Sequence, residues 1–245
     1  MSKNTQIYGI RAVMEAIESK EPIDKVYIQK GLKGHLSREL ENLVRKEGIP
    51  ASFVPLEKIN KLSQNNHQGV VATISPISFQ TMESLIDKVL AQKKDPLFLL
   101  LDGISDVRNL GAIIRTAECS GVDGIIMPKK GAAPITGDTV KTSAGAVFKI
   151  PIAKTDHIKD AVFYLKASGV MVVAATEKTN NLLYTLDLKG AVAVIMGAED
   201  TGISPSILKE SDHTAKLPLM GEIGSLNVSV ACGIFLFEVV RQRMS

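Results

Sequence analysis

Apolar residues along the chain follow two spacings, one typical of amphipathic helices and one typical of buried strands. Residues 10–17 carry apolar side chains at helical spacing, and so do residues 36–44, a helix that Gly48 can end as a C-terminal cap. Strands are predicted near residues 25–29, 52–54 and 70–74. These patterns predict a small α/β module over residues 1–75.

A second α/β pattern follows Pro76, which favours an extended linker. Residues 76–94 are interpreted as this linker and a first helix, and residues 95–245 as a larger domain. Short apolar runs at 97–101, 124–127, 170–175 and 191–196 alternate with amphipathic segments. Such runs are typical of a mostly parallel sheet covered on both faces. The last helix, residues 228–243, is apolar around much of its circumference, which favours burial in a core or in a subunit interface.

The composition is that of an ordinary globular protein, with 45% hydrophobic and 22% charged residues in 245. No apolar run approaches the roughly 18 residues that a membrane span needs. The N-terminus MSKNTQIYGI lacks the apolar core of a signal peptide, and the two cysteines form no CxxC pair, so we expect a reducing cytoplasm.

Positive charge is concentrated in the first third of the chain. Residues 1–75 carry 11 Lys and Arg against 8 Asp and Glu, whereas the remainder carries 18 of each. This excess is a weak indication of a polyanionic partner. With no Trp and 4% aromatic residues, stacking of bases on an aromatic platform is not expected to dominate recognition.

Three loops rich in glycine and polar residues follow predicted strands. They are residues 101–111, which run into a helix carrying Arg115, residues 196–202, and residues 217–227. Each loop alone is typical of an ordinary glycine turn. Ligands of open parallel sheets bind outside the carboxyl ends of the strands, so three such loops at one edge favour a nucleotide-like ligand held by backbone groups.

Several common sites are excluded or disfavoured. There is no GxGxxG after a strand and no GxxxxGK[ST], which argues against a Rossmann dinucleotide site and a P-loop. The four histidines show no HExxH or paired spacing, so no metal site is expected. The SxxK match at residues 206–209 lacks its companion motifs. Cys119 and Cys232 lie among apolar residues and are expected to be buried thiols.

Five polar side chains in or beside these loops are candidate functional groups, and each has a structural alternative. Arg115 shares a helix face with the small residues 111 and 112, which leave its guanidinium accessible; a surface pair with Glu118 is the alternative. Glu199 can bind a ribose hydroxyl, orient Arg115, or be a solvated carboxylate. Helix capping is the alternative for Asn109, Ser225 and Asn227.

The same residues resemble the motifs of the SpoU (TrmH-like) branch of the SPOUT RNA methyltransferases. Residues 109–117 (NLGAIIRTA) resemble its first motif, residues 196–202 (MGAEDTG) its second, and residues 217–220 with 225–229 (LPLM and SLNVS) its third. The match covers roughly residues 95–245. The first 75 residues resemble the substrate-binding module of the RlmB and YacO type, through Tyr8-Gly9-Ile10 and His67-Gln68-Gly69-Val70.

This resemblance implies methyl transfer from S-adenosylmethionine to an RNA ribose 2′-hydroxyl. It implies an α/β domain with a C-terminal trefoil knot, an exception to the rule against knots, and a homodimer whose formation builds the active site. By the same analogy the cofactor would be held by residues Met196, Gly197, Leu217, Leu219 and Leu226. The sulfonium of the cofactor supplies a cationic leaving group, so no metal is needed.

The chemical difficulty lies in the nucleophile, because a ribose hydroxyl is a weak acid. The family proposal makes the motif arginine, here Arg115, the activating group, but arginine is a poor general base. We expect Arg115 instead to stabilise the developing alkoxide and grip a phosphate. The expected supporting polar groups are Asn109, Glu199, Ser225 and Asn227. Asp200 stands where the family more often has glycine, and it adds negative charge near a phosphate site.

The resemblance to the RlmB type favours a guanosine of large-subunit (23S) ribosomal RNA as the target. Transfer RNA is the alternative substrate, and a non-catalytic RNA-binding or ribosome-assembly protein on the same fold is the alternative class. The N-terminal module would recognise RNA by shape and phosphate contacts. Its candidate cations are Lys25, Lys30, Lys33, Arg38, Arg45 and Lys46.

Overall fold

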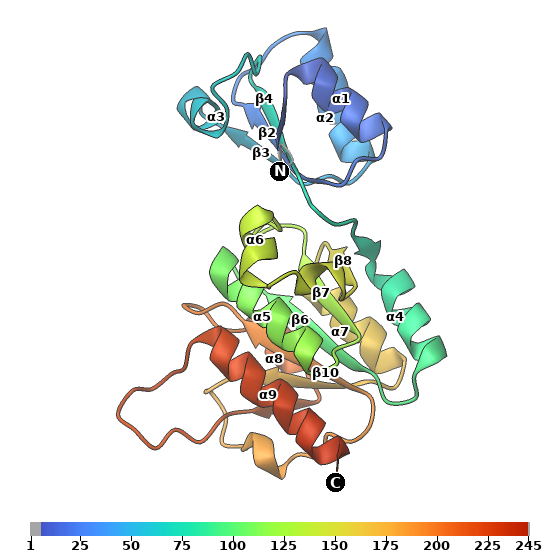
Figure 1. Ribbon diagram of the computed structural model, residues 1–245, viewed down its shortest axis with the longest axis vertical. Helices are drawn as coiled ribbons and strands as arrows, with labels where there is room; N and C mark the ends of the chain where they lie inside the picture. Colours follow the sequence, from blue (N-terminus) through green and yellow to red (C-terminus); the bar gives the residue numbers. More distant parts are fainter. Residues whose placement is uncertain (1–5, 245) are drawn as a thin grey trace. The chain divides into compact units, whose positions relative to one another are not determined.

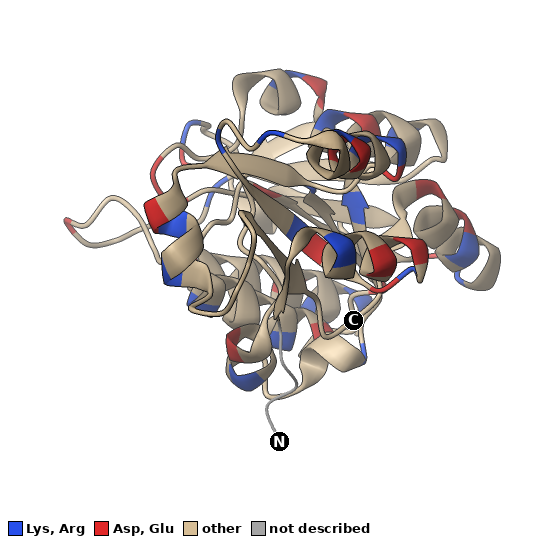
Figure 2. Ribbon diagram, turned by 90° about the horizontal axis from the view of Figure 1, so that it is seen from above, with Lys and Arg blue, Asp and Glu red and all other residues tan. Residues whose placement is uncertain are grey.

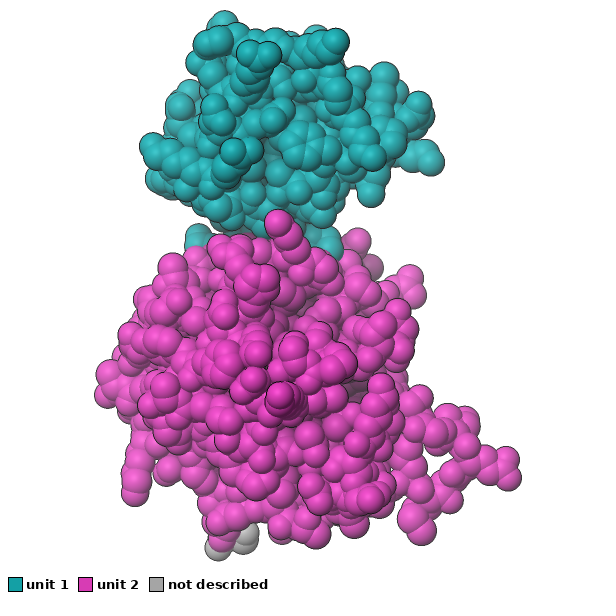
Figure 3. Space-filling model, turned by 180° about the vertical axis from the view of Figure 1, so that it is seen from behind, with its two compact units in different colours: residues 1–78, 134–137 teal, residues 79–133, 138–245 magenta. Residues whose placement is uncertain are grey.

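The computed structural model describes residues 6–244, which divide into two units (Figure 3). The first takes in the chain up to residue 78 together with residues 134–137. The second takes in residues 79–133 and the chain from residue 138 onward. Each unit has a sheet and a core of its own.

The first unit is a four-stranded sheet, ordered β1-β4-β2-β3, with three helices. Strand β4 is antiparallel to β1 and β2, whereas β3 is parallel to β2. The elements are β1 (Gln6–Tyr8), α1 (Ile10–Glu18), β2 (Ile23–Gln29), α2 (His35–Lys46), β3 (Ala51–Val54), α3 (Leu56–Leu62) and β4 (Val70–Ile74).

Alternation along β4 decides how this sheet is covered. Val70 and Ala72 belong to the core formed with α1 and α2, while Val71 packs with Ile59 of α3. Successive side chains of a strand point to opposite faces, so one strand supplies both packing surfaces. The sequence prediction located α1, α2 and the three longer strands of this unit but missed β1 and α3.

The second unit is a seven-stranded sheet, ordered β11-β9-β10-β6-β7-β8-β5, and every described pair in it is parallel. Its strands are β5 (Gln80–Thr81), β6 (Leu97–Asp102), β7 (Gly124–Pro128), β8 (Ile152–Thr155), β9 (Met171–Ala175), β10 (Val192–Gly197) and β11 (His213–Ala215). Its helices are α4 (Met82–Gln92), α5 (Val107–Cys119), α6 (Gly137–Thr142), α7 (Ile158–Ala167), α8 (Pro205–Glu210) and α9 (Val228–Arg243), with short 3₁₀ turns at Ala146–Phe148 and Leu183–Thr185.

Helices cover both faces of this sheet. The core on one face combines α4, α7 and α8 with alternate residues of the strands, such as Phe98 and Leu100 on β6. Helices α5 and α9 pack against each other on the opposite face (Figure 1). Double coverage explains why β6 is a continuous apolar run, and the predicted α/β architecture is confirmed.

The sheet order places a switch point beside β6. The chain runs outward from β6 to β7 and β8 on one side, and later fills β10, β9 and β11 on the other. The carboxyl ends of β6 and β10 therefore lie side by side, in register at Asp102 and Gly197. Crevices at such points are the usual ligand sites of open α/β sheets.

The two cysteines differ in exposure. Cys232, on α9, is buried, and burial raises the pKa of its thiol to about 12. Cys119 is exposed at the end of α5, so the prediction of a buried thiol was wrong there. Cys119 is the last residue of its helix and lies outside the buried stripe, which ends at Ala117.

Candidate functional site

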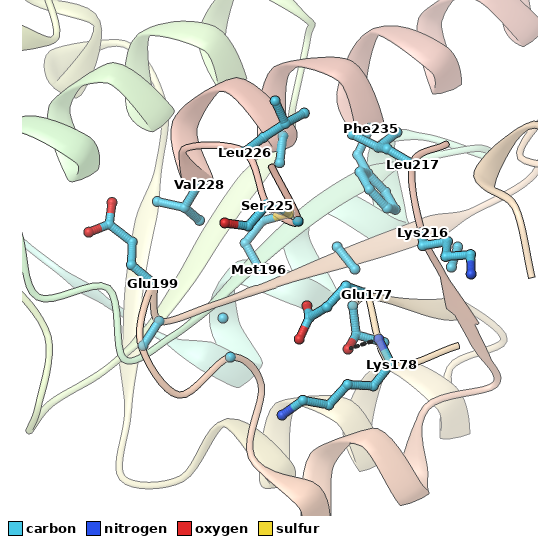
Figure 4. A pocket seen from close by; sticks show the side chains of 18 of the residues that line it. Glu177, Lys178, Met196, Glu199, Lys216, Leu217, Ser225, Leu226, Val228 and Phe235 are labelled. Atoms are coloured by element: carbon cyan, nitrogen blue, oxygen red, sulfur yellow. Dashed lines mark hydrogen bonds between the residues drawn. The ribbon is translucent and has the colours of Figure 1, made fainter. Parts of the chain in front are cut away.

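A cavity of about 340 Å³ lies at the carboxyl ends of β9, β10 and β11 (Figure 4). One wall is apolar and comes from α9 and the loop before it, with Leu217, Leu226, Val228 and Phe235. The remaining lining comes from the ends of the three strands and the segments that follow them: residues 175–178, 196–202 and 215–216. The volume falls within the ~300–1,000 Å³ range of small-molecule sites.

The loop after β10 is shaped by two glycines. A Cβ atom on Gly197 would lie 2.3 Å from the backbone of both Gly202 and Ile203, so no larger residue fits without displacing the chain. Gly202 has φ +69, and its N–H donates to the carbonyl of Ala198 at 2.8 Å. The tight turn holds Glu199 and Asp200 at the edge of the cavity.

Beside the cavity, three polar side chains from different elements form one hydrogen-bonded cluster. Glu199 accepts a short hydrogen bond from the Asn109 amide and a 3.5 Å bond from the Asn227 amide, and Asn227 also donates to Asn109 Oδ1 at 3.1 Å. The cluster therefore joins the start of α5, the loop after β10 and the start of α9. The sequence predicted all three as functional candidates, and the fold brings them together.

Helix capping was the alternative interpretation of the two asparagines, and it applies to only one. Asp106 is the N-cap of α5 and accepts from the Asn109 N–H at 2.8 Å. Asn109 therefore does not cap that helix, and its side-chain amide bonds to Glu199 instead. Asn227 does cap α9, since its Oδ1 accepts from the Ser229 N–H at 2.9 Å. That bond also fixes the Asn227 NH₂ group toward Glu199.

A second hollow, of about 270 Å³, lies next to the cavity and shares Glu199 and Asp200 with it. It is also lined by Asp106 and Asn109 and by the segment after β6, residues 104–105. Three of its six lining residues are carboxylates, and none is Lys or Arg. Asp200 accepts from the Thr201 N–H at 2.9 Å and lines both spaces.

Arg115 lies on the surface of α5 and lines neither space. Among residues 6–244 its side chain makes no hydrogen bond or ion pair, and the alternative pairing with Glu118 was wrong, because Glu118 pairs with Lys149 at 3.7 Å. The absence of a side chain at Gly111 was expected to leave the Arg115 guanidinium accessible, but the structure shows a different reason. A Cβ there would lie 1.8 Å from Thr142 Oγ1, so Gly111 lets Thr142, on α6, approach α5.

All five residues predicted to hold the cofactor line the larger cavity: Met196, Gly197, Leu217, Leu219 and Leu226. Ser225 lines it as well and does not cap α9. Sequence reasoning missed the segment after β9, Thr176 to Lys178, together with Lys216 and Phe235. Strand β9 was predicted, so the rule that ligands bind at carboxyl ends could have found the residues that follow it. This segment has no glycine and so lacks the signal that marked the other three loops.

Two further classes of site were sought in the described part of the chain. No group of three or more His, Cys, Asp or Glu side chains is placed to hold a metal ion. No described helix is both long and apolar enough to cross a membrane.

Comparison with known proteins identifies the class to which this fold and site belong. Residues 96–237 match the SpoU rRNA Methylase family, and residues 6–80 match the domain described as RNA 2′-O ribose methyltransferase substrate binding. The first match covers more than half of the 245 residues. The chain belongs to the SpoU rRNA methylase family.

Individual relatives resemble the chain over nearly its whole length. The 23S rRNA (guanosine-2′-O-)-methyltransferase RlmB of Vibrio cholerae is 35% identical over 245 residues, covering 99% of this chain and 98% of the relative. A TrmH-family protein of Staphylococcus saprophyticus, named as a tRNA/rRNA methyltransferase, is 36% identical over 97% of this chain and 95% of the relative. The AdoMet-bound rRNA methyltransferase of Sinorhizobium meliloti superposes with a TM-score of 0.63 at 27% identity, over 98% of this chain and 88% of that one.

Proposed function

We propose that this chain transfers the methyl group of S-adenosylmethionine to the 2′-hydroxyl of a guanosine in 23S ribosomal RNA. The observation that carries the proposal is the cavity that adjoins the Asn109–Glu199–Asn227 cluster within the family-matched region. Full-length similarity to an RlmB protein named for this reaction supports the substrate. Transfer RNA is the second candidate, favoured by the similarity to a relative named for both RNA classes.

The larger cavity suits the cofactor in chemistry and in size. When bound, S-adenosylmethionine supplies a methyl group already activated on a sulfonium. The apolar side chains Leu217, Leu226 and Phe235 offer a surface for the adenine ring, and backbone groups around Met196 and Gly197 offer hydrogen bonds. Leu219 and Ser225 complete the proposed cofactor-binding set.

The cluster beside the cavity is suited to hold the accepting ribose. Glu199 is oriented by the amides of Asn109 and Asn227, which fixes a carboxylate and amide groups at the wall between the two spaces. The hydroxyl oxygen would bond to the methyl carbon as the methyl–sulfur bond breaks, which leaves a neutral thioether, and the hydroxyl proton would pass to water. Donors that are already in place for the developing oxyanion lower the barrier to that step.

Arg115 is the proposed source of that stabilisation, and we propose that it acts in the hollow of a second copy of the chain. In its own chain it lines neither space. It lies on α5, which packs against α9, and α9 exposes the apolar side chains Val230 (52%) and Phe237 (48%). A homodimer that buries this apolar surface would bring a guanidinium to a hollow lined by three carboxylates.

The first unit is the proposed RNA-recognition module. The proposed functional parts of the chain are this module (residues 1–75), a linker with a first helix (residues 76–94) and the methyltransferase domain (residues 95–245). The module's candidate cations form separate groups: Lys30, Lys33 and Arg38 lie around the start of α2, and Arg45 and Lys46 at its end. Lys25 is held differently, with its Nζ 5.3 Å from the centre of the Tyr27 ring. Helix α2 has no acidic residue in its first turn, which favours phosphate near Lys30 and Lys33.

The path of the C-terminal segment supports the trefoil knot as a further proposal. Strand β11 lies at one edge of the sheet, yet the chain then returns to place α9 against α5 and β10 in the interior of the unit.

Activity on ribosomal RNA also agrees with a cytoplasmic location, which we propose. Basic and acidic residues occur side by side on several helices, so RNA binding would depend on local groups of cations rather than on overall charge (Figure 2).

Methyl transfer to two RNA pools tests the proposed function. The pools are large-subunit ribosomal RNA and bulk transfer RNA, both from cells lacking this gene, with labelled S-adenosylmethionine as donor. Label in alkali-resistant dinucleotides of the ribosomal pool is expected. Label confined to transfer RNA would make transfer RNA, not ribosomal RNA, the substrate. Absence of both cofactor binding and methyl transfer would favour a non-catalytic RNA-binding protein.

A further inference from the structure

Two residues of opposite charge line the cofactor cavity in the segment that follows β9. Glu177 and Lys178 are both exposed, and neither side chain has a hydrogen bond or ion pair among residues 6–244. The backbone N–H of Lys178 donates to Thr176 Oγ1 at 3.2 Å, which fixes this short segment at the strand end. In Figure 4 the Glu177 carboxylate points toward the side of Met196 and Ser225, while the ammonium groups of Lys178 and Lys216 point away from the other labelled side chains.

The remaining walls of the cavity differ in chemistry from this charged side. Leu217, Leu226 and Phe235 form an apolar wall, and Glu199, bound to Asn109, marks the side next to the second hollow. S-adenosylmethionine has three corresponding parts: a flat adenosine, a reactive sulfonium and an amino-acid end that carries an ammonium and a carboxylate. The adenine suits the apolar wall, and the sulfonium must face the acceptor, which leaves the charged side for the amino-acid end.

We infer that Glu177 and Lys178 form a subsite for the zwitterionic amino-acid end of the cofactor. Glu177 accepts hydrogen bonds from the α-ammonium, and Lys178 donates to the α-carboxylate. Both contacts are charge-assisted, and each satisfies a charged group that has no partner in the described part of the chain. The inference rests on the proposed function, because it assumes that the cavity binds this cofactor.

Two nucleosides that differ only at the amino-acid end provide the test. S-adenosylhomocysteine carries the full amino-acid end, whereas 5′-methylthioadenosine has the same thioether nucleoside without it. Binding of each to the full chain would be measured by calorimetry for the unaltered protein, Glu177→Gln and Lys178→Met. The matched controls are Glu57→Gln and Lys189→Met, which remove exposed charges outside the cavity.

The expected result is a loss of S-adenosylhomocysteine affinity of roughly threefold to tenfold in each variant, since solvent weakens contacts at exposed charges. Affinity for 5′-methylthioadenosine should not change, and neither control should affect either ligand. An equal loss for both nucleosides in Glu177→Gln would assign that carboxylate to the ribose and overturn the inference. No loss, or a loss in only one of the two variants, would also overturn it.

Failure of the proposed function would look different. If the unaltered chain bound neither nucleoside, the cofactor assignment itself would be wrong, and the subsite with it. Thermal unfolding of each variant would show whether a lost affinity reflects a lost fold. Both substitutions are at exposed positions, so the unfolding midpoint should stay close to that of the unaltered protein.

Discussion

The two spaces at the carboxyl edge of the parallel sheet share a wall but differ in what they offer a ligand. The larger cavity has an apolar wall, polar segments that follow the strands, and charged side chains of both signs. The smaller hollow beside it is lined by three carboxylates and no cation. Glu199 and Asp200 belong to both.

This difference indicates how much of an active site one chain can build. The first space has the groups that a small charged nucleoside needs. The second would repel the phosphates that flank any RNA ribose, because three carboxylates face it without a compensating cation. The motif arginine that could supply the cation lies on α5, outside both spaces. We therefore propose a complete cofactor site and an acceptor site that a second copy completes.

The largest effect is expected from Arg115→Ala. Loss of the stabilising guanidinium should lower the rate of methyl transfer by ~10²-fold or more, while cofactor affinity stays unchanged. Arg115→Lys keeps the charge but loses the forked geometry and should recover part of the rate. Single-turnover transfer and calorimetry measure the two quantities, and a near-normal rate for Arg115→Ala would remove the arginine from the mechanism.

Gly197→Ala should act on the other space. The new Cβ would meet the backbone of Gly202 and Ile203 at 2.3 Å and would displace the turn that borders the cavity. We expect cofactor affinity to fall roughly tenfold or more, as is common when a backbone turn in a ligand site must move. Gly190→Ala is the matched control, since a Cβ there has no neighbour within 4 Å. The cofactor affinity of this variant should equal that of the unaltered protein.

Glu199 belongs to the shared wall, and Glu199→Gln separates its charge from its shape. The amide retains the size of the side chain but removes the carboxylate that accepts from Asn109 and Asn227. The transfer rate should fall by about tenfold, a typical cost of misorienting a supporting group, with a smaller change in cofactor affinity. A fall in affinity without a fall in rate would place Glu199 in the cofactor site alone.

The smallest effect is expected from Asp200→Gly. Removing one of three carboxylates from the hollow should ease the approach of phosphate, so activity should stay the same or rise by no more than about threefold. The Michaelis constant for RNA, measured at two salt concentrations, checks this. A collapse in rate would show that the carboxylate has a role of its own.

Much of this arrangement could be predicted from local sequence. The apolar runs located β6, β7, β9 and β10, and the helix predicted at residues 228–243 has the bounds of α9. The glycine-rich loops located most of the cavity because parallel strands end at one edge. Local patterns carry this information whenever one short segment both forms an element and borders the site.

What could not be predicted depends on contacts between distant segments. The fit of Thr142 against Gly111 joins α6 to α5, and no spacing along the chain encodes it. The short β1 and α3 have too few residues for a periodic signal. The carboxyl end of β9 could have pointed to Glu177 and Lys178, but their place beside the loop after β10 depends on the pairing of β9 with β10.

Complementation between two impaired variants, assayed at a cofactor concentration low enough that each variant alone has little activity, tests the central claim most directly. Arg115→Ala and Gly197→Ala chains would be unfolded together, refolded in equal amounts and assayed for methyl transfer. If Arg115 of one chain serves the cofactor and acceptor sites of the other, random pairing should restore about a quarter of the unaltered activity. If the arginine serves its own chain, every site in the mixture is defective and no activity returns, which would contradict the account.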